Sequence, residues 1–297
     1  MSTVTIRATD PVVEAAAESA ALSGASAIGA ALAGYMAAAG EHPGVLFSPM
    51  GMLIFAFGAC RALDGRCRQP GEEARRPRGF HASETPPDAA YFAVPQGITA
   101  TFVAMAYDES RAVAPIVAPG MARAKAVGAK GRTALLDRIK SFGPAALADP
   151  SVIEPLLHLA GPVQGGLLTA KDFSARRSTD QTAIRKETDA TSATLRGPWA
   201  DATTMPDSSE VNSICALDGR GGATVLSYHR CTSGIAIPEY NLIVPRAAVP
   251  VRRGVTRVSP GTTLEAHLPG VIHVTSGKVT RVDSELEVDQ AISVLKR

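Results

Sequence analysis

A dense group of polar and reactive side chains, Tyr228-His229-Arg230-Cys231, lies at the end of a predicted strand. The imidazole of His229 can exchange a proton near neutral pH, so His229 is a candidate general base. A histidine beside an arginine also suits a structural or exposed position, and that alternative stays open. Cys215, on the preceding predicted strand, is interpreted as a small core residue.

Arg66 follows an apolar run and the turn residues Asp64-Gly65. A strand end is where a binding residue projects, so Arg66 is a candidate for holding an anionic substrate; a solvated turn residue is the alternative. His267 and His273 lack acidic neighbours at ligand spacing, and none of the four cysteines forms a C-x-x-C pair. The sequence therefore predicts no metal site, and it indicates no cofactor.

The composition narrows the class of protein. The chain has 297 residues, a formal net charge of +2, 45% hydrophobic and 20% charged residues. Charge balance argues against a nucleic-acid partner, and the apolar content argues against disorder. No segment is apolar enough to span a membrane, no signal peptide is evident, and four cysteines form no disulfide framework. These features predict a cytoplasmic globular protein and leave a homo-oligomer open.

Residue patterning predicts helices first and strands later. The predicted helices are two within 11–40, separated at Gly24, and others within 98–106, 111–141, 151–160 and 285–296. The predicted strands are one continuous buried strand over 52–63, a hairpin of 213–218 with 223–228, and strands within 234–244, 271–275 and 279–283. Residues 174–206 are interpreted as a linker or mobile segment.

Several stretches, in order along the chain, resemble the gamma-glutamyltransferase family of N-terminal-nucleophile hydrolases. The most specific is Gly165-Gly-Leu-Leu-Thr-Ala-Lys-Asp-Phe173, which is similar to a segment near the end of that family's large subunit. Leu63-Asp-Gly-Arg66 resembles the strand end that carries a carboxylate-binding arginine, and Ser213 to Val225 resembles the first hairpin of the small subunit. Val94-Pro95-Gln-Gly97 and Val255 to Pro260 also resemble family segments.

The resemblance implies an α+β fold, a four-layer αββα sandwich, in a single domain over residues 1–297. Its large-subunit-like half would be 1–180, its linker 181–207 and its small-subunit-like half 208–297. The family is usually nearly twice this length, so this chain resembles a shortened, divergent member. For the family, the resemblance implies cleavage or transfer of a gamma-glutamyl amide.

The position of the nucleophile has two interpretations. In the family, a threonine begins the first small-subunit strand, cleaves the chain before itself and uses its own freed amine as base. An ungapped alignment on Asp218 puts Val211 and Asn212 at the two threonines, which leaves no nucleophile. A two-residue insertion instead makes Asp207-Ser208-Ser209-Glu210 equivalent to Asp-Thr-Thr-His, with Ser208 as nucleophile and cleavage after Asp207; Ser209 is the neighbouring candidate. The same serine-rich stretch also suits an ordinary loop.

The substrate-binding positions are changed relative to the family. Its two carboxylate-binding serines would correspond to Thr256 and Arg257, so that Arg257 with Arg66 could hold a carboxylate through two guanidinium groups. The family's paired aspartates would fall near Ala247-Ala248 and are lost. We therefore expect a small carboxylate-bearing substrate that need not be a gamma-glutamyl amide, in a specialised biosynthetic role.

Two classes of function remain open from the sequence. The first is an enzyme acting on an amide or related acyl bond, either processed with Ser208 as nucleophile, or unprocessed and using His229 or Glu210 for a different reaction. The second is a protein that has lost the nucleophile and binds a ligand or acts as a scaffold.

Overall fold

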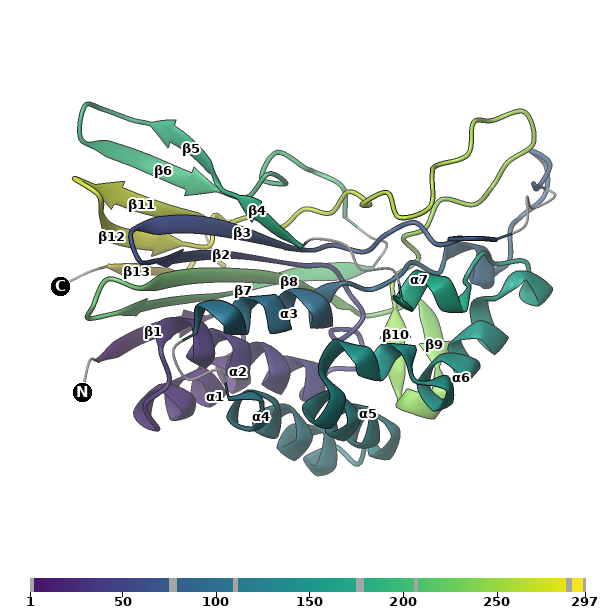
Figure 1. The fold of residues 1–297 in the computed structure, drawn as a ribbon, viewed down its shortest axis with the longest axis horizontal. Helices are drawn as coiled ribbons and strands as arrows, with labels where there is room; N and C mark the ends of the chain where they lie inside the picture. Colours follow the sequence, from purple (N-terminus) through teal and green to yellow (C-terminus); the bar gives the residue numbers. More distant parts are fainter. Residues whose placement is uncertain are drawn as a thin grey trace.

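The structure is a computed structural model that describes residues 3–74, 79–108, 112–174, 179–205, 208–286 and 290–295. Two antiparallel sheets pack face to face, and helices cover the outer face of the first sheet (Figure 1). One hydrophobic core lies between the helices and the first sheet, and a second core lies between the two sheets. The α+β class and the sandwich predicted from the sequence are confirmed.

The first sheet has six strands, all paired antiparallel. In spatial order they are β1 (Val4–Ala8), β7 (Ser209–Asp218), β8 (Ala223–Cys231), β2 (Met50–Ala56), β3 (Ala59–Gly65) and β4 (Asp180–Thr182). The predicted hairpin is formed by β7 and β8, which lie at the centre beside β2 (Figure 1). Side chains alternate between the helix face and the face turned toward the second sheet, here called the inter-sheet face.

The second sheet has five antiparallel strands. In spatial order they are β13 (Ser293–Leu295), β12 (Lys278–Asp283), β11 (Val271–Thr275), β6 (Ser192–Arg196) and β5 (Ile184–Glu187). A separate two-stranded ribbon, β9 (Ile235–Ile237) with β10 (Leu242–Val244), follows β8. Within the described ranges, no helix covers the outer face of the second sheet (Figure 1), so those residues form the αββ part of the expected sandwich.

Seven α-helices are described. They are α1 (Pro11–Leu22), α2 (Ala27–Glu41), α3 (Gly97–Ala104), α4 (Val113–Ala126), α5 (Lys130–Phe142), α6 (Pro150–Ala160) and α7 (Ala170–Ser174). Short 3₁₀ turns are Asp88–Tyr91, Met105–Tyr107, Gly143–Ala148, Pro162–Gln164 and Pro238–Tyr240. Asp10 caps α1 by accepting from the backbone N–H of Val12, as the sequence predicts.

Helix α2 is the centre of the helical layer, and ten of its fifteen residues are alanine or glycine. It contacts α1, α4, β7 and β8, and residues 27–40 are all buried. Glycines let the α2 and α4 backbones touch: a Cβ on Gly40 would lie 2.0 Å from the carbonyl oxygen of Gly120, and one on Gly120 would lie 2.4 Å from that of Met36. The close approach packs α4 on α2, which in turn contacts β7 and β8 of the first sheet.

Three sequence expectations differ from the structure. The run 52–63 is two strands joined by a turn at Phe57-Gly58, because both residues have positive φ and reverse the chain. The segment 181–207, expected as a linker, contains β5, β6 and part of β4; β5 is exposed throughout, and the alternation of β6 covers only five residues. The expected last helix over 285–296 contains β13 within its described part, because its apolar residues complete the second sheet's edge.

We predict that Gly120→Ala lowers the free energy of unfolding by about 2 kcal/mol, because the added methyl group overlaps a backbone oxygen that cannot rotate away. Chemical denaturation monitored by circular dichroism measures the change. Ala122→Ser, at an exposed position of the same helix, is the control and should change stability little. Equal stability of Gly120→Ala and wild type would contradict the close packing of α2 and α4.

Candidate catalytic site between the two sheets

Ser209 and His229 meet on the inter-sheet face of the first sheet. Ser209 pairs with Cys231 and Val211 pairs with His229, so Ser209 and His229 are diagonal neighbours on β7 and β8. The Ser209 Oγ lies 3.0 Å from the His229 Nδ1. The structure thus brings together two residues that the sequence indicated separately.

The hydrogen bonds of His229 define which ring nitrogen carries the proton. Nε2 lies 2.7 Å from the backbone carbonyl oxygen of His267, which can only accept, so Nε2 carries the hydrogen. In the neutral ring Nδ1 is then an acceptor, and Ser209 Oγ–H donates to it. Burial lowers the pKa of His229 to about 4, although the bond to the His267 carbonyl opposes that shift. His229 is therefore neutral at pH 7 and oriented to take a proton from Ser209.

The peptide bond between Ser208 and Ser209 has a polarised carbonyl group. The Ser208 oxygen accepts from both the backbone N–H and the Oγ1–H of Thr232, each at 2.8 Å. Ser208 has φ of 52°, in the left-handed region that a non-glycine residue adopts at an energetic cost. Strain and two donors on one carbonyl make this bond a better target for attack than its neighbours.

The other members of the serine-rich stretch point elsewhere. Glu210, on the opposite face of β7 from Ser209, forms an ion pair with Arg230 across the strands. Ser208 is exposed and lies outside β7, and Asp207 lies outside the described residues. Val211 shares the inter-sheet face with Ser209 by strand alternation. Of the two serines in this stretch, Ser209 is the one whose hydroxyl is hydrogen-bonded to a base, His229.

Arg66 is held in place by a carboxylate and an aromatic ring. Its Nε and Nη2 donate to the two oxygens of buried Asp64, at 3.0 and 2.9 Å, and the guanidinium carbon lies 5.7 Å from the centroid of the Trp199 ring. Trp199 in turn packs on Gly51, where a Cβ would lie 2.8 Å from the ring. Among the described residues, no acceptor bonds the remaining nitrogen, Nη1, which is left for a ligand.

Thr256 and Arg257 lie in a different group of contacts from Arg66. Thr256 is exposed, and the Nη2 of Arg257 lies 3.5 Å from the carbonyl oxygen of Gly71. The charge of Arg257 also acts on Asp172. Among the described residues, the hydrogen bonds of Arg66 and of Arg257 share no partner, and the two-arginine clamp stays a prediction.

The motif that most resembles the family has a structural role here. Asp172 accepts from the backbone N–H groups of Gly71 and Glu72, both at 2.9 Å, and from Thr169. Burial raises the pKa of Asp172, while these hydrogen bonds oppose the shift. The motif therefore fastens the loop after Arg66 to α7 and to Thr169 just before it.

Three residues of this region were not indicated by the sequence: Thr232, Asp64 as the partner of Arg66, and the His267 carbonyl. Only Asp64 left a signal, its position two residues before Arg66 at a strand end; the others depend on tertiary contacts.

Cys215 lies in the inter-sheet core, where burial raises the pKa of its thiol, as expected of a core residue. No group of three metal-ligating side chains exists in the described ranges. None of the described helices is long and apolar enough to cross a membrane.

We predict that stability falls with acidification because of His229. Its pKa is lowered from 6.5 to about 4 on folding, so the unfolded chain binds the proton more readily between these values. The His229 contribution is complete above pH 6.5 and decreases as the pH falls toward 4, by about 3 kcal/mol in total at 1.4 kcal/mol per unit. Denaturant unfolding at several pH values measures it.

The matched variant for this measurement is His229→Gln, whose side chain can still donate and accept. The difference in pH dependence between the two proteins isolates His229, because His273, whose pKa burial also lowers, titrates in both. Identical slopes between pH 6.5 and 4 would show that His229 is not buried in the neutral form.

Comparison with known proteins supports the fold. No protein-family model and no curated protein matches the chain. A cephalosporin acylase structure from Bacillus halodurans superposes with a TM-score of 0.75 and 13% identity, covering 95% of this chain and 77% of the acylase. The structure of LmbA2991HD superposes with a TM-score of 0.72 and 11% identity, covering 98% of this chain and 80% of that protein. A gamma-glutamyltranspeptidase from Pseudomonas nitroreducens, complexed with L-DON, superposes with a TM-score of 0.51 and 16% identity, covering 64% of this chain and 69% of the transpeptidase. The chain has the fold of these proteins, and the resemblance stated from the sequence is confirmed at the level of the fold.

Proposed function

We propose that the protein is an amide-bond hydrolase or acyltransferase whose nucleophile is Ser209, released by self-cleavage between Ser208 and Ser209. The hydrogen bond from Ser209 Oγ to the neutral Nδ1 of His229 carries the proposal. The polarised, strained Ser208 carbonyl beside it supports self-cleavage at this bond. The shared fold of the acylase and the transpeptidase is consistent with chemistry on amide bonds.

Self-cleavage would follow from the groups in contact. Ser209 Oγ attacks the Ser208 carbonyl carbon as its proton passes to His229 Nδ1, and Thr232 stabilises the negative oxygen of the intermediate. The C–N bond then breaks, and the proton goes to the Ser209 nitrogen, leaving an ester. Water hydrolyses the ester to give the Ser208 carboxylate and a Ser209 with a free amine and hydroxyl.

The same groups would then act on a substrate. The Ser209 hydroxyl attacks the substrate carbonyl carbon, with the new amine or His229 accepting its proton, and the leaving amine receives that proton when the C–N bond breaks. Arg66 Nη1 would hold a substrate carboxylate. A cytoplasmic setting belongs to the proposal, because all four cysteines are free thiols, the form that a reducing compartment maintains.

We expect purified protein to contain two fragments, residues 1–208 and 209–297, when its denatured mass is measured after prolonged incubation. Ser209→Ala should remain a single chain, because the attacking oxygen is gone. Ser208→Ala should still cleave, because only the Ser208 carbonyl takes part.

The pair of variants distinguishes two cleavage sites. Cleavage after Asp207 requires the hydroxyl of Ser208, so it would be abolished in Ser208→Ala and retained in Ser209→Ala. Ser209→Cys, which keeps a nucleophile, should restore cleavage and shows that the position folds. An uncut wild-type chain would reject self-cleavage.

An uncut chain would leave a second function that the geometry favours, a serine hydrolase in which His229 activates Ser209 in the intact protein. A fluorophosphonate probe tests it, since labelling of Ser209, located by peptide mass, requires an activated hydroxyl. Labelling lost in His229→Gln would support this function. If the chain is neither cut nor labelled, Ser209 is no nucleophile and the protein is a ligand-binding or scaffold member of the fold.

We predict that a substrate carboxylate is recognised by Arg66. Glutaryl-p-nitroanilide should be hydrolysed at least tenfold faster, in kcat/KM, than pentanoyl-p-nitroanilide, which has no carboxylate. The double variant Asp64→Asn with Arg66→Gln removes both charges of the buried pair together and should abolish that preference while keeping activity on the neutral substrate. A preference that survives in the double variant would assign carboxylate binding to another residue.

A further inference from the structure

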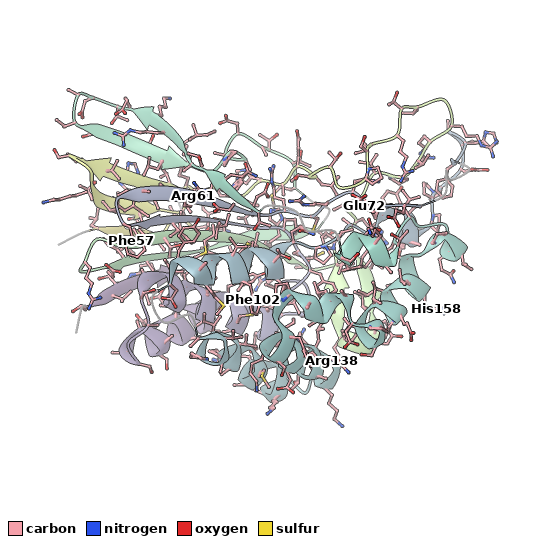
Figure 2. The ribbon with its side chains drawn as sticks, in the orientation of Figure 1. Phe57, Arg61, Glu72, Phe102, Arg138 and His158 are labelled. Carbon is pink, nitrogen blue, oxygen red and sulfur yellow. The ribbon has the colours of Figure 1, made fainter. Side chains whose placement is uncertain are left out.

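A cavity lies at the other end of the sandwich from Ser209. It has a volume of about 820 Å³ and is lined by Asp218 and Arg220, at the far end of β7. The ten residues of β7 separate this cavity from Ser209 by about 30 Å at 3.3 Å per residue. Phe57, on the cavity wall, lies far from Glu72, a residue of the loop beyond Arg66 (Figure 2). The cavity is therefore separate from the candidate catalytic site.

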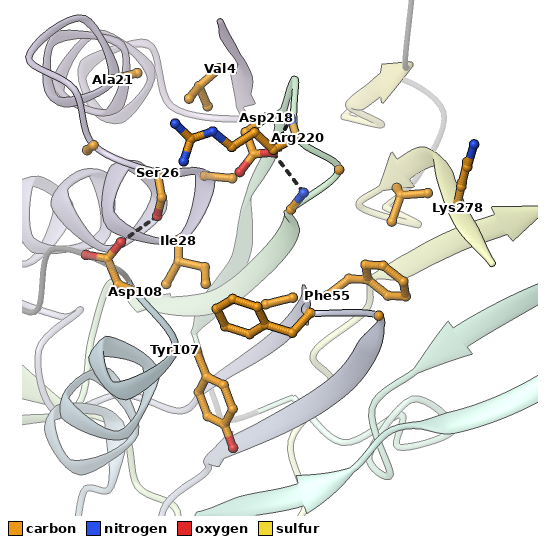
Figure 3. A pocket seen from close by; sticks show the side chains of 18 of the residues that line it. Val4, Ala21, Ser26, Ile28, Phe55, Tyr107, Asp108, Asp218, Arg220 and Lys278 are labelled. Carbon is orange, nitrogen blue, oxygen red and sulfur yellow. Dashed lines mark hydrogen bonds between the residues drawn. The ribbon is translucent and has the colours of Figure 1, made fainter. Parts of the chain in front are cut away.

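Three hairpin turns surround the cavity, those joining β2 to β3, β7 to β8 and β11 to β12 (Figure 3). Their glycines leave it open: a Cβ on Gly58 or Gly277 would meet no atom within 4 Å. The start of α2 forms a further wall through Ile28. A cavity of this volume with convergent walls is in the range of sites for small organic molecules.

The walls are apolar and the rim is positively charged. Ile28, Phe55 and Phe57 supply apolar and aromatic surface, while Arg220 and Lys278 stand exposed at the rim, from the turn after β7 and the start of β12 (Figure 3). Lys278 makes no ion pair within the described residues. An aromatic or aliphatic body with a negatively charged group fits this combination.

The two aspartates of the cavity are engaged by the protein. Asp218 accepts from the backbone N–H groups of Arg220 and Gly222, at 2.9 and 2.8 Å, and so holds its own turn. Asp108 accepts from Ser26 at 2.6 Å, and Ser26 caps α2. Both carboxylates accept hydrogen bonds from the chain itself, whereas Lys278 makes no ion pair among the described residues and is the group placed to attract a negatively charged ligand.

Phe57 is in a position that folding alone does not favour. It is the first residue of a two-residue turn, with φ of 52° followed by 76° at Gly58, where asparagine is the preferred residue. A bulky residue with positive φ is uncommon, and this side chain is 86% exposed, so it gains little from packing. The strained aromatic residue is explained if it packs on a ligand.

We propose that this cavity is a second binding site, for a small organic anion with a planar apolar body, which stacks on Phe57 and is paired by Lys278 at the rim. The site is independent of the proposed hydrolase function. It would let a metabolite bind at one end of the sandwich while the chemistry proceeds at the other.

The probe is 8-anilino-1-naphthalenesulfonate, an anion with an aromatic body, whose fluorescence rises on binding. Wild-type protein should bind it, and 2-naphthoate should displace it at a concentration at least tenfold lower than the cation 2-naphthylmethylammonium does. Phe57→Asn should weaken binding at least fivefold while leaving the melting temperature equal or higher, because Asn-Gly suits the turn. Lys278→Gln should reduce the preference for naphthoate over the cation.

Val163→Asn is the matched control, since Val163 is 95% exposed and lies outside the cavity lining. It should bind the probe as wild type does. Unchanged affinity in Phe57→Asn, equal displacement by the anion and the cation, or the absence of probe binding would each overturn the proposal. The melting temperatures show that lost binding does not arise from lost folding.

Discussion

The hydrogen bond from His229 Nε2 to the carbonyl oxygen of His267 determines the arrangement of side chains at the end of the sandwich. It fixes the hydrogen on Nε2, so that Nδ1 faces Ser209 as an acceptor. It also ties β8 to the loop that leads into β11, because His267 is itself held by the carbonyl oxygens of Ala202 and Thr204. One bond thus joins the two sheets, compensates part of the cost of burying an imidazole and aligns a base with a hydroxyl.

Much of the fold could be predicted because local signals agreed with it. Asp10 and Gly24 mark helix boundaries, and the glycine-rich turn after Asp218 marks the hairpin of β7 and β8. Strand β5 was missed because it is the edge strand of the second sheet and is exposed along its whole length. Strand β6 was missed because its alternation, with Ala193 and Leu195 between polar residues, covers only five residues. The turn at Phe57 was missed because phenylalanine is not a typical turn residue, and the apolar run around it has the pattern of one continuous strand.

The candidate site was predictable residue by residue but not as a group. Ser209 and His229 stand out by type, yet their contact depends on the register of β7 against β8, and a shift of one residue would move Ser209 to the opposite face. Arg66 was found as a strand-end cation, and its pairing with Asp64 is local, whereas the stacking on Trp199 depends on the segment that follows β6. The segment of greatest family likeness, around Asp172, proved to fasten a loop, since such a motif can persist for packing as well as for chemistry.

Trp199 is the only tryptophan of the chain and is wedged between backbone segments at Gly51 and Gly197, 4% exposed, beneath the guanidinium of Arg66. Its indole therefore acts as a built-in optical reporter whose emission arises from one place, the contact between the two sheets beside Arg66. A change in the wavelength or the quenching of its emission would record the separation of the two sheets before the helical layer unfolds. Tryptophan fluorescence therefore distinguishes the loosening of the core between the sheets from the loss of the core under the helices.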